Sequence, residues 1–178
     1  MKLEKLKYPI GTYSPDKNPS QQQLKIWLDD LETFPSSVEK LVDALDNEML
    51  NWKYRPDGWT IKQVVHHCAD SHMNSIIRFK LALTEDKPTI RPYFEDRWAL
   101  LPDSQENDLT PSLQILKAIH FKLVLLLKTL SNEQLQREFI HPEHGKAFNL
   151  AETVGNYAWH SNHHLAHIKQ ALAFENKF

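Results

Sequence analysis

The feature that most constrains the fold is a helical spacing of apolar residues in four long stretches of the chain. Apolar side chains recur at three- and four-residue steps, and the clearest stripe runs from Leu113 to Leu130. No stretch of comparable length alternates as a strand would. The pattern therefore predicts an all-α fold, a four-helix bundle whose stripes pack against one another.

Local signals place the first two helices. The first is expected over 20–46, with Pro35 bending or interrupting it because proline removes a helix hydrogen bond. The second should follow a capping box in which Thr60 faces Gln63, and should end near Thr84.

The other two helices also have start signals. Thr110 is expected to be an N-cap, followed by Pro111 at the first helical position. Asn149 resembles the cap of the last helix, which should reach about Glu175. A connection as long as 85–110 tends to be functional or to contain a short helix.

The remaining segments complete a single expected domain over 1–178. Residues 1–19 are rich in proline and are expected to form an irregular N-terminal arm. A short helical turn should start at Ser131, and 137–148 suits a loop or a small hairpin. The long connections argue against the simplest up-down-up-down bundle with tight loops.

Composition excludes several classes of function. A chain with 41% apolar and 25% charged residues has the composition of a globular domain. Its net charge of −2 gives no excess of basic residues with which to bind nucleic acid or an anionic membrane. No apolar run approaches the roughly 20 residues of a membrane span, and only 4 glycines are present, without a phosphate-binding loop. A lone cysteine, Cys68, favours a reducing compartment and a cytoplasmic location.

Histidine is the anomalous residue type, with 10 in the chain. On the last helix His160 and His164 are four residues apart and share one face. Lys169 and Asn162 project from roughly the opposite side, and lysine rarely points into a core. The face of His160 and His164 is therefore expected to point inward, where imidazoles need hydrogen bonds or a metal ion.

The second helix carries a matching polar stripe at the border of its apolar face, formed by His67, Asp70, Ser71, Asn74 and Arg78. Turned toward the last helix, this stripe would bring His67 close to the inward histidines. Three neutral imidazoles with an open fourth position are typical of catalytic zinc sites, although nickel, copper and iron also accept imidazole. The alternative is a set of buried histidines satisfied by hydrogen bonds. His120 is expected at the edge of the core.

Neighbouring polar residues suggest further roles. Asp70 could orient an imidazole or act as a general base, or could simply form a salt bridge. Asn74 and Arg78 could bind a carboxylate or amide of a substrate, although Arg78 could equally pair with a local acid. Arg91 lies in the long connection over 85–110. It could line the mouth of a pocket at the metal site, or simply hold that connection against the bundle.

Several segments resemble one protein family. The stretch over 58–80 resembles the second helix of DinB/YfiT-like proteins, and Tyr8–Gly11, Ile90–Tyr93 and Trp159–Ile168 resemble their YfiT branch. The resemblance extends over about 8–172. It implies a four-helix bundle, a homodimer, and one divalent metal ion per chain bound by the three histidines 67, 160 and 164.

Three functions remain open. The first is a metal-dependent hydrolase of a small-molecule substrate, in which zinc or nickel activates water. The second, implied by the family, is a metal-dependent S-transferase that uses a metal-bound thiolate of a low-molecular-weight thiol such as bacillithiol or mycothiol. The third is a non-catalytic helical dimer whose histidines are structural.

Overall fold

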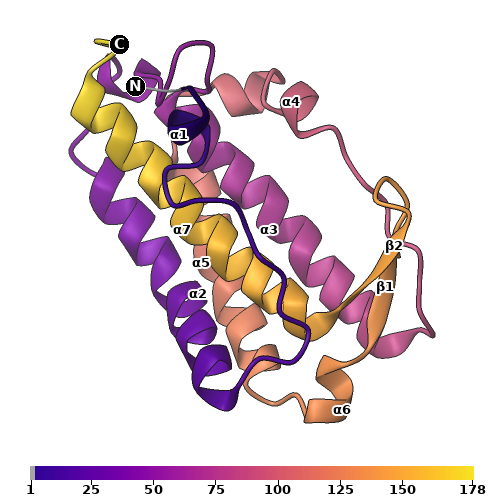
Figure 1. Ribbon diagram of the computed structural model, residues 1–178. Helices are drawn as coiled ribbons and strands as arrows, with labels where there is room; N and C mark the ends of the chain where they lie inside the picture. The colour runs from indigo at the N-terminus through magenta and orange to yellow at the C-terminus, as the bar shows by residue number, and fades with distance from the viewer. Residues whose placement is uncertain (1–2) are drawn as a thin grey trace.

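The computed structural model, which describes residues 3–178, contains four long helices packed as a bundle (Figure 1). These helices are α2 (Gln21–Val42), α3 (Ile61–Thr84), α5 (Thr110–Leu127) and α7 (Leu150–Phe174). The all-α bundle expected from the apolar stripes is confirmed.

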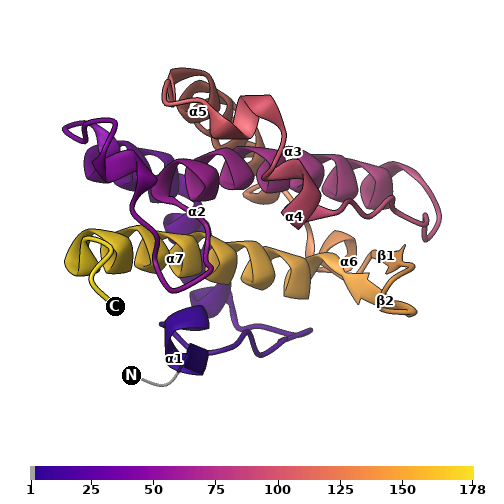
Figure 2. The same ribbon diagram turned by 90° about the horizontal axis from the view of Figure 1, so that it is seen from above.

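The packing order of the helices differs from their order in the chain. Helix α2 packs mainly against α5 and α7, and α3 packs mainly against the same two helices. The consecutive helices α2 and α3 therefore lie diagonally across the bundle. Seen from above, α3 and α7 run side by side (Figure 2). This arrangement needs long connections and is not the simplest up-down-up-down bundle.

The apolar stripes meet in a well-packed interior. Leu31, Phe79 and Leu123 are fully buried at one end of the bundle, whereas Val38 and Leu116 are fully buried in the other main cluster. Each such side chain contributes roughly 1.5–3 kcal/mol on burial. Helix α5 is long and apolar enough to pass as a membrane span by composition alone, but it serves here as one wall of the bundle.

Short elements fill the segments between the long helices. The arm contains α1 (Leu3–Lys7), so the expectation of a wholly irregular arm is wrong for these residues. Met1 and Lys2 lie outside the described residues. The other short elements are η1 (Met49–Asn51), α4 (Glu95–Trp98), η2 (Pro102–Gln105), α6 (Asn132–Leu135), β1 (Glu138–His141) and β2 (Lys146–Asn149). The two strands pair antiparallel, which confirms the small hairpin.

Two helix boundaries differ from the sequence-based expectation. Helix α2 ends at Val42 rather than near residue 46. Helix α5 already includes Thr110 and has Leu109 as its N-cap, without a side-chain cap bond. The hydroxyl of Thr110 is therefore not the cap. The capping boxes of α3 and α7 are formed as expected.

The sequence predicted that Pro35 would either bend or interrupt the first helix. Helix α2 continues through Pro35 without interruption, so the second of these outcomes is wrong. Proline lacks the N–H that would bind the carbonyl of Leu31 one turn earlier. That carbonyl instead lies 2.6 Å from Nδ1 of His120 on α5. His120 is only 2% exposed, so it lies inside the bundle rather than at the edge of the core.

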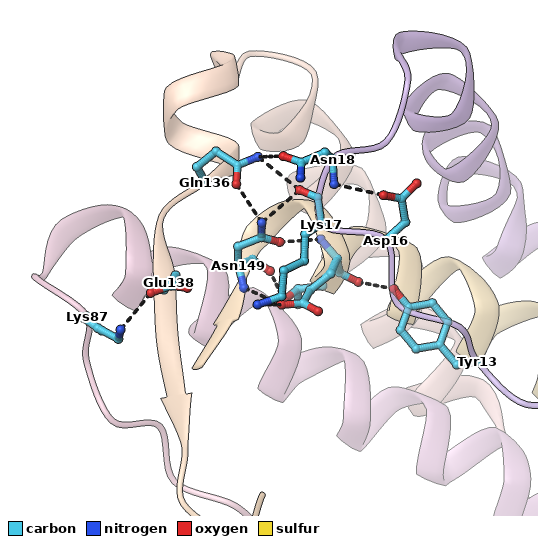
Figure 3. Close-up of polar contacts among 10 residues, drawn as sticks. Tyr13, Asp16, Lys17, Asn18, Lys87, Gln136, Glu138 and Asn149 are labelled. Carbon is cyan, nitrogen blue, oxygen red and sulfur yellow. Dashed lines mark hydrogen bonds and ion pairs between the residues drawn. The ribbon is translucent and has the colours of Figure 1, made fainter. Parts of the chain in front are cut away.

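The N-terminal arm is attached along α7 and the base of the hairpin (Figure 3). The hydroxyl of Tyr13 donates to the carbonyl of Glu152 at 2.6 Å. The carbonyl of Lys17 accepts from the amides of Asn149 at 3.0 Å and Gln136 at 3.1 Å. These bonds satisfy backbone groups of an otherwise irregular segment and hold it against the bundle.

The close approach of the arm and α2 to α7 can be tested at Gly155. An added Cβ would lie 2.8 Å from two ring carbons of Trp27 and 2.9 Å from the hydroxyl of Tyr13. We expect Gly155→Ala to lower the free energy of unfolding by about 1–2 kcal/mol in urea titrations, because the clash outweighs the gain in helix propensity. In a Trp27→Leu background the same change should cost clearly less, because only the contact with Tyr13 remains. An equal loss in both backgrounds would contradict this explanation.

Candidate metal centre

The side-by-side packing of α3 and α7 brings three predicted ligands together. His67 comes from α3, and His160 and His164 come from successive turns of α7. One ring nitrogen of each lies within 4.8 Å of the corresponding nitrogen of the other two. The Nε2 atoms of His67 and His160 are 3.2 Å apart. The three imidazoles therefore converge on one point between the helices.

Local structure explains why these three side chains converge. The capping boxes at Thr60 and Asn149 define where the two helices begin, and so which faces they present to each other. The indole of Trp59, next to the cap of α3, packs against the His67 ring with a centroid separation of 4.7 Å. The site is therefore built on rigid elements and walled by an aromatic side chain.

Burial keeps the three imidazoles neutral. His67 and His164 are 7% and 6% exposed, and His160 is partly buried. Desolvation, with a smaller contribution from His163, lowers the pKa of His67 to about 4. Desolvation, followed by neighbouring histidines, lowers the pKa values of His160 and His164 well below the ordinary range. Neutral rings keep the lone pairs that a metal ion requires.

The opposite ring nitrogens of the α7 pair are occupied by other histidines. Nδ1 of His160 lies 3.1 Å from Nε2 of His72, and Nδ1 of His164 lies 3.4 Å from Nδ1 of His167. Nε2 of His167 in turn lies 3.0 Å from the carbonyl oxygen of Lys7. Metal-binding histidines commonly use their second nitrogen in such a contact. This leaves the Nε2 atoms facing the point of convergence.

The separation of one nitrogen pair fits a tetrahedral ion. Zn–N bonds of about 2.0–2.1 Å place two ligand nitrogens roughly 3.3 Å apart in tetrahedral geometry. The observed 3.2 Å between Nε2 of His67 and Nε2 of His160 is close to that value. The cluster has three donors within the described range 3–178, which is the number found in catalytic rather than structural zinc sites.

Asp70 lies one helical turn beyond His67 at the border of the bundle. Desolvation, together with the charge of Asp103, raises the pKa of Asp70 to about 6. The same carboxylate contributes to the raised pKa of Tyr93, so it lies on the side where the central connection covers α3. A carboxyl group with this pKa can exchange a proton near neutral pH.

The structure separates the three residues expected to bind substrate. Asn74 donates its side-chain amide to the carbonyl of Asp70 on its own helix at 2.9 Å. Arg91 is exposed just before α4. Arg78 instead extends toward α7, where its Nη1 donates to the hydroxyl of Tyr157 at 3.3 Å.

Arg78 lines a cavity of about 290 Å³ between α7, the hairpin and the arm. Its Nε, like Nδ1 of His141 on the same wall, is buried without a hydrogen-bond partner in the described structure. The Tyr157 ring forms part of the wall and lies 6.0 Å from the His160 ring. The other lining residues are Tyr13, Pro15, Phe139, His144, Lys146, Phe148, Glu152, Thr153 and Asn156. The charged part of the lining is therefore mainly basic, with Arg78 and Lys146 against Glu152, and the cavity adjoins the histidine cluster.

Sequence reasoning gave no role to His72, His120 or His141, which all contact or adjoin the site. His141 lies at the end of β1 in the hairpin, and no local pattern marks it. His120 had a usable signal, because Pro35 must leave one carbonyl of its helix without a partner. Identifying His120 as the partner of that carbonyl would have required knowing that α5 packs beside α2.

The buried histidines make stability depend on pH. Histidines 67, 72, 120, 160, 163, 164 and 167 all have lowered pKa values in the fold, with desolvation as the main cause. The unfolded chain takes up protons below about pH 6.5, whereas the folded chain resists them down to about pH 4. Stability is therefore complete above pH 6.5 and decreases as pH falls through this window.

We expect the urea midpoint of the metal-free protein to be constant from pH 8 to 7 and to fall steeply as the pH drops below 6.5. Each histidine that stays neutral only in the fold costs about 1.4 kcal/mol per pH unit. Asp70, with its raised pKa, offsets a small part of this loss. A midpoint unchanged between pH 6.5 and 5 would show that the histidines are not buried as described.

Comparison with known proteins gives a consistent result. The sequence model of the DinB superfamily matches residues 30–168. YfiT of Bacillus subtilis (strain 168), named as a candidate metal-dependent hydrolase, is 46% identical over 165 residues, which cover 93% of each chain. A Bacillus cereus (strain 03BB102) protein with the same description is 46% identical over 166 residues, covering 93% of this chain and 95% of that protein.

The fold comparison leads to the same family. The solved structure of B. subtilis YfiT superposes with a TM-score of 0.92. That protein is described as a candidate metal-dependent hydrolase with an unusual four-helix bundle topology. Its sequence is 44% identical, and the match covers 95% of this chain and 97% of YfiT. The resemblance noted in the sequence is thereby confirmed, and the protein belongs to the DinB superfamily.

Proposed function

We propose that this protein is a divalent-metal-dependent hydrolase of small molecules, with one zinc or nickel ion per chain bound by His67, His160 and His164. The observation that carries the proposal is the convergence of three neutral imidazoles, whose nitrogens lie within 4.8 Å of one another and include one pair at 3.2 Å. The description of YfiT as a candidate metal-dependent hydrolase supports it. Histidines satisfied only by hydrogen bonds would not require three ring nitrogens to face one point.

The residues around the trio have distinct roles in this proposal. A bound divalent ion supplies a Lewis acid that lowers the pKa of a ligand and polarises a carbonyl group. Asp70, with a pKa of about 6, accepts and returns a proton at the border of the site. Arg78 binds an anionic group of the substrate through its planar guanidinium. Asn74 and Arg91 help to line the approach to the site.

Metal content tests the proposed ligands. Protein purified without a histidine tag should contain about one divalent ion per chain by elemental analysis, and His164→Ala should lose it. His66→Ala is the matched control, because His66 is buried on α3 but contacts Ser112 and the backbone of Glu106 instead of the trio. No metal in the wild type, with no tight uptake of zinc or nickel on titration, would refute the metal-dependent function.

Thiol transfer is a second candidate, favoured by the basic lining of the adjoining cavity. Arg78, His141 and Lys146 suit a co-substrate that carries carboxylates, and zinc stabilises a thiolate as readily as a hydroxide. The two reactions differ in their products. Hydrolysis incorporates solvent oxygen without added thiol, whereas S-transfer consumes a thiol such as bacillithiol and forms a thioether.

Kinetics of Arg78→Met test the proposed substrate contact. For an anionic substrate or thiol, we expect KM to rise by about 10- to 100-fold, because a charge-assisted hydrogen bond contributes about 1.5–3 kcal/mol. Metal content should stay near one ion per chain. Lys80→Met, on an exposed face of the same helix, is the control and should leave KM unchanged. An unaltered KM in Arg78→Met would exclude this residue from substrate binding.

A further inference from the structure

A continuous row of histidines joins a backbone carbonyl of α2 to the proposed metal ligand on α7. Nδ1 of His120 lies 2.6 Å from the carbonyl oxygen of Leu31. Nε2 of His120 lies 2.7 Å from Nδ1 of His72. Nε2 of His72 lies 3.1 Å from Nδ1 of His160. Three hydrogen bonds therefore cross the bundle interior and end at a ligand of the trio.

The direction of every hydrogen bond in this row follows from its first member. A carbonyl oxygen can only accept, so Nδ1 of His120 must carry the hydrogen. A neutral imidazole has one N–H, so Nε2 of His120 accepts from Nδ1 of His72. By the same rule Nε2 of His72 accepts from Nδ1 of His160. The Nε2 atom of His160 then carries no hydrogen, and its lone pair faces Nε2 of His67 at 3.2 Å.

Packing holds the rings of the row in place. His72 is fully buried and His120 is 2% exposed. The ring of Phe34 stacks on His72 with a centroid separation of 5.4 Å and contacts His120 at 5.2 Å. Because both rings are enclosed by the core, their charged forms are excluded, and each ring carries a single hydrogen. Neither ring can rotate without leaving a buried nitrogen unpaired.

Pro35 explains why the row has a carbonyl on which to end. In an uninterrupted α-helix the Leu31 carbonyl would be occupied by the N–H of residue 35. Proline has no N–H, so this buried acceptor needs a partner from another helix. His120 supplies it from α5. The residue that weakens α2 thus provides the fixed acceptor that sets the direction of the row.

We propose that His120 and His72 are positioning residues that lock His160 in its Nδ1–H tautomer, so that Nε2 presents a lone pair to the trio before any metal ion arrives. The tautomer of a histidine is set by the partner of its other nitrogen. Only the identification of His160 as a metal ligand rests on the proposed function. The tautomer itself is a property of the metal-free protein.

The first experiment measures this tautomer directly. In metal-free, ¹⁵N-histidine-labelled protein at pH 7.5, long-range ¹H–¹⁵N correlation spectra should show His120, His72 and His160 all protonated on Nδ1. In His120→Phe the His72 ring loses its fixed acceptor, so we expect His72 and His160 to populate both tautomers. A wild-type His160 protonated on Nε2 would overturn the proposal, whether or not the protein binds metal.

The second experiment measures zinc affinity by competition with a chelator. We expect the Kd for Zn²⁺ to rise about 10- to 100-fold in His72→Phe and about 10-fold or less in His120→Phe. His66→Phe is the matched control, because it replaces a buried histidine of α3 whose partners lie outside the row. A Kd in His72→Phe equal to that of His66→Phe would overturn the proposal. Absence of zinc binding in the wild type would instead refute the proposed function.

Discussion

The interior of this bundle is governed by the need to satisfy buried imidazole nitrogens. Desolvation excludes the charged form of these rings, so each nitrogen requires a hydrogen bond or a metal ion. Two carbonyl oxygens, those of Leu31 and Lys7, terminate the contacts that begin at His160 and His164. The consequence is that one ring nitrogen each of His67, His160 and His164 is directed to a single point, where α3 and α7 face each other.

This constraint links parts of the fold that have no direct contact with the proposed site. Pro35 provides an unpaired acceptor in α2, and the N-terminal arm provides the carbonyl that accepts from His167. The arm is in turn held by Tyr13 and Lys17. The basic cavity beside Tyr157 is enclosed by the same arm and by the hairpin. The segments outside the four long helices thus complete the site, while the helices supply its ligands.

Much of the fold and the core of the site could be predicted from local patterns. Apolar spacing predicted four helices, and the pairs Thr60–Gln63 and Asn149–Glu152 correctly predicted where two of them begin. The four-residue spacing of His160 and His164 predicted a shared inward face. Local signals were less reliable where packing outweighs propensity. Helix α2 passes through Pro35 because a neighbouring histidine satisfies the carbonyl that proline leaves unpaired.

The sequence by itself determined the helical faces, because side chains three and four residues apart must share a side of any α-helix. It therefore determined that His160 and His164 share one face and that His67 shares a stripe with Asp70 and Arg78. Only the tertiary structure decided which helix each face meets, since α2 and α3 are consecutive in the chain yet diagonal in the bundle. The roles of His72, His120 and His141 depend on that pairing. Contacts between distant segments are set by packing of the whole core, which no local spacing encodes.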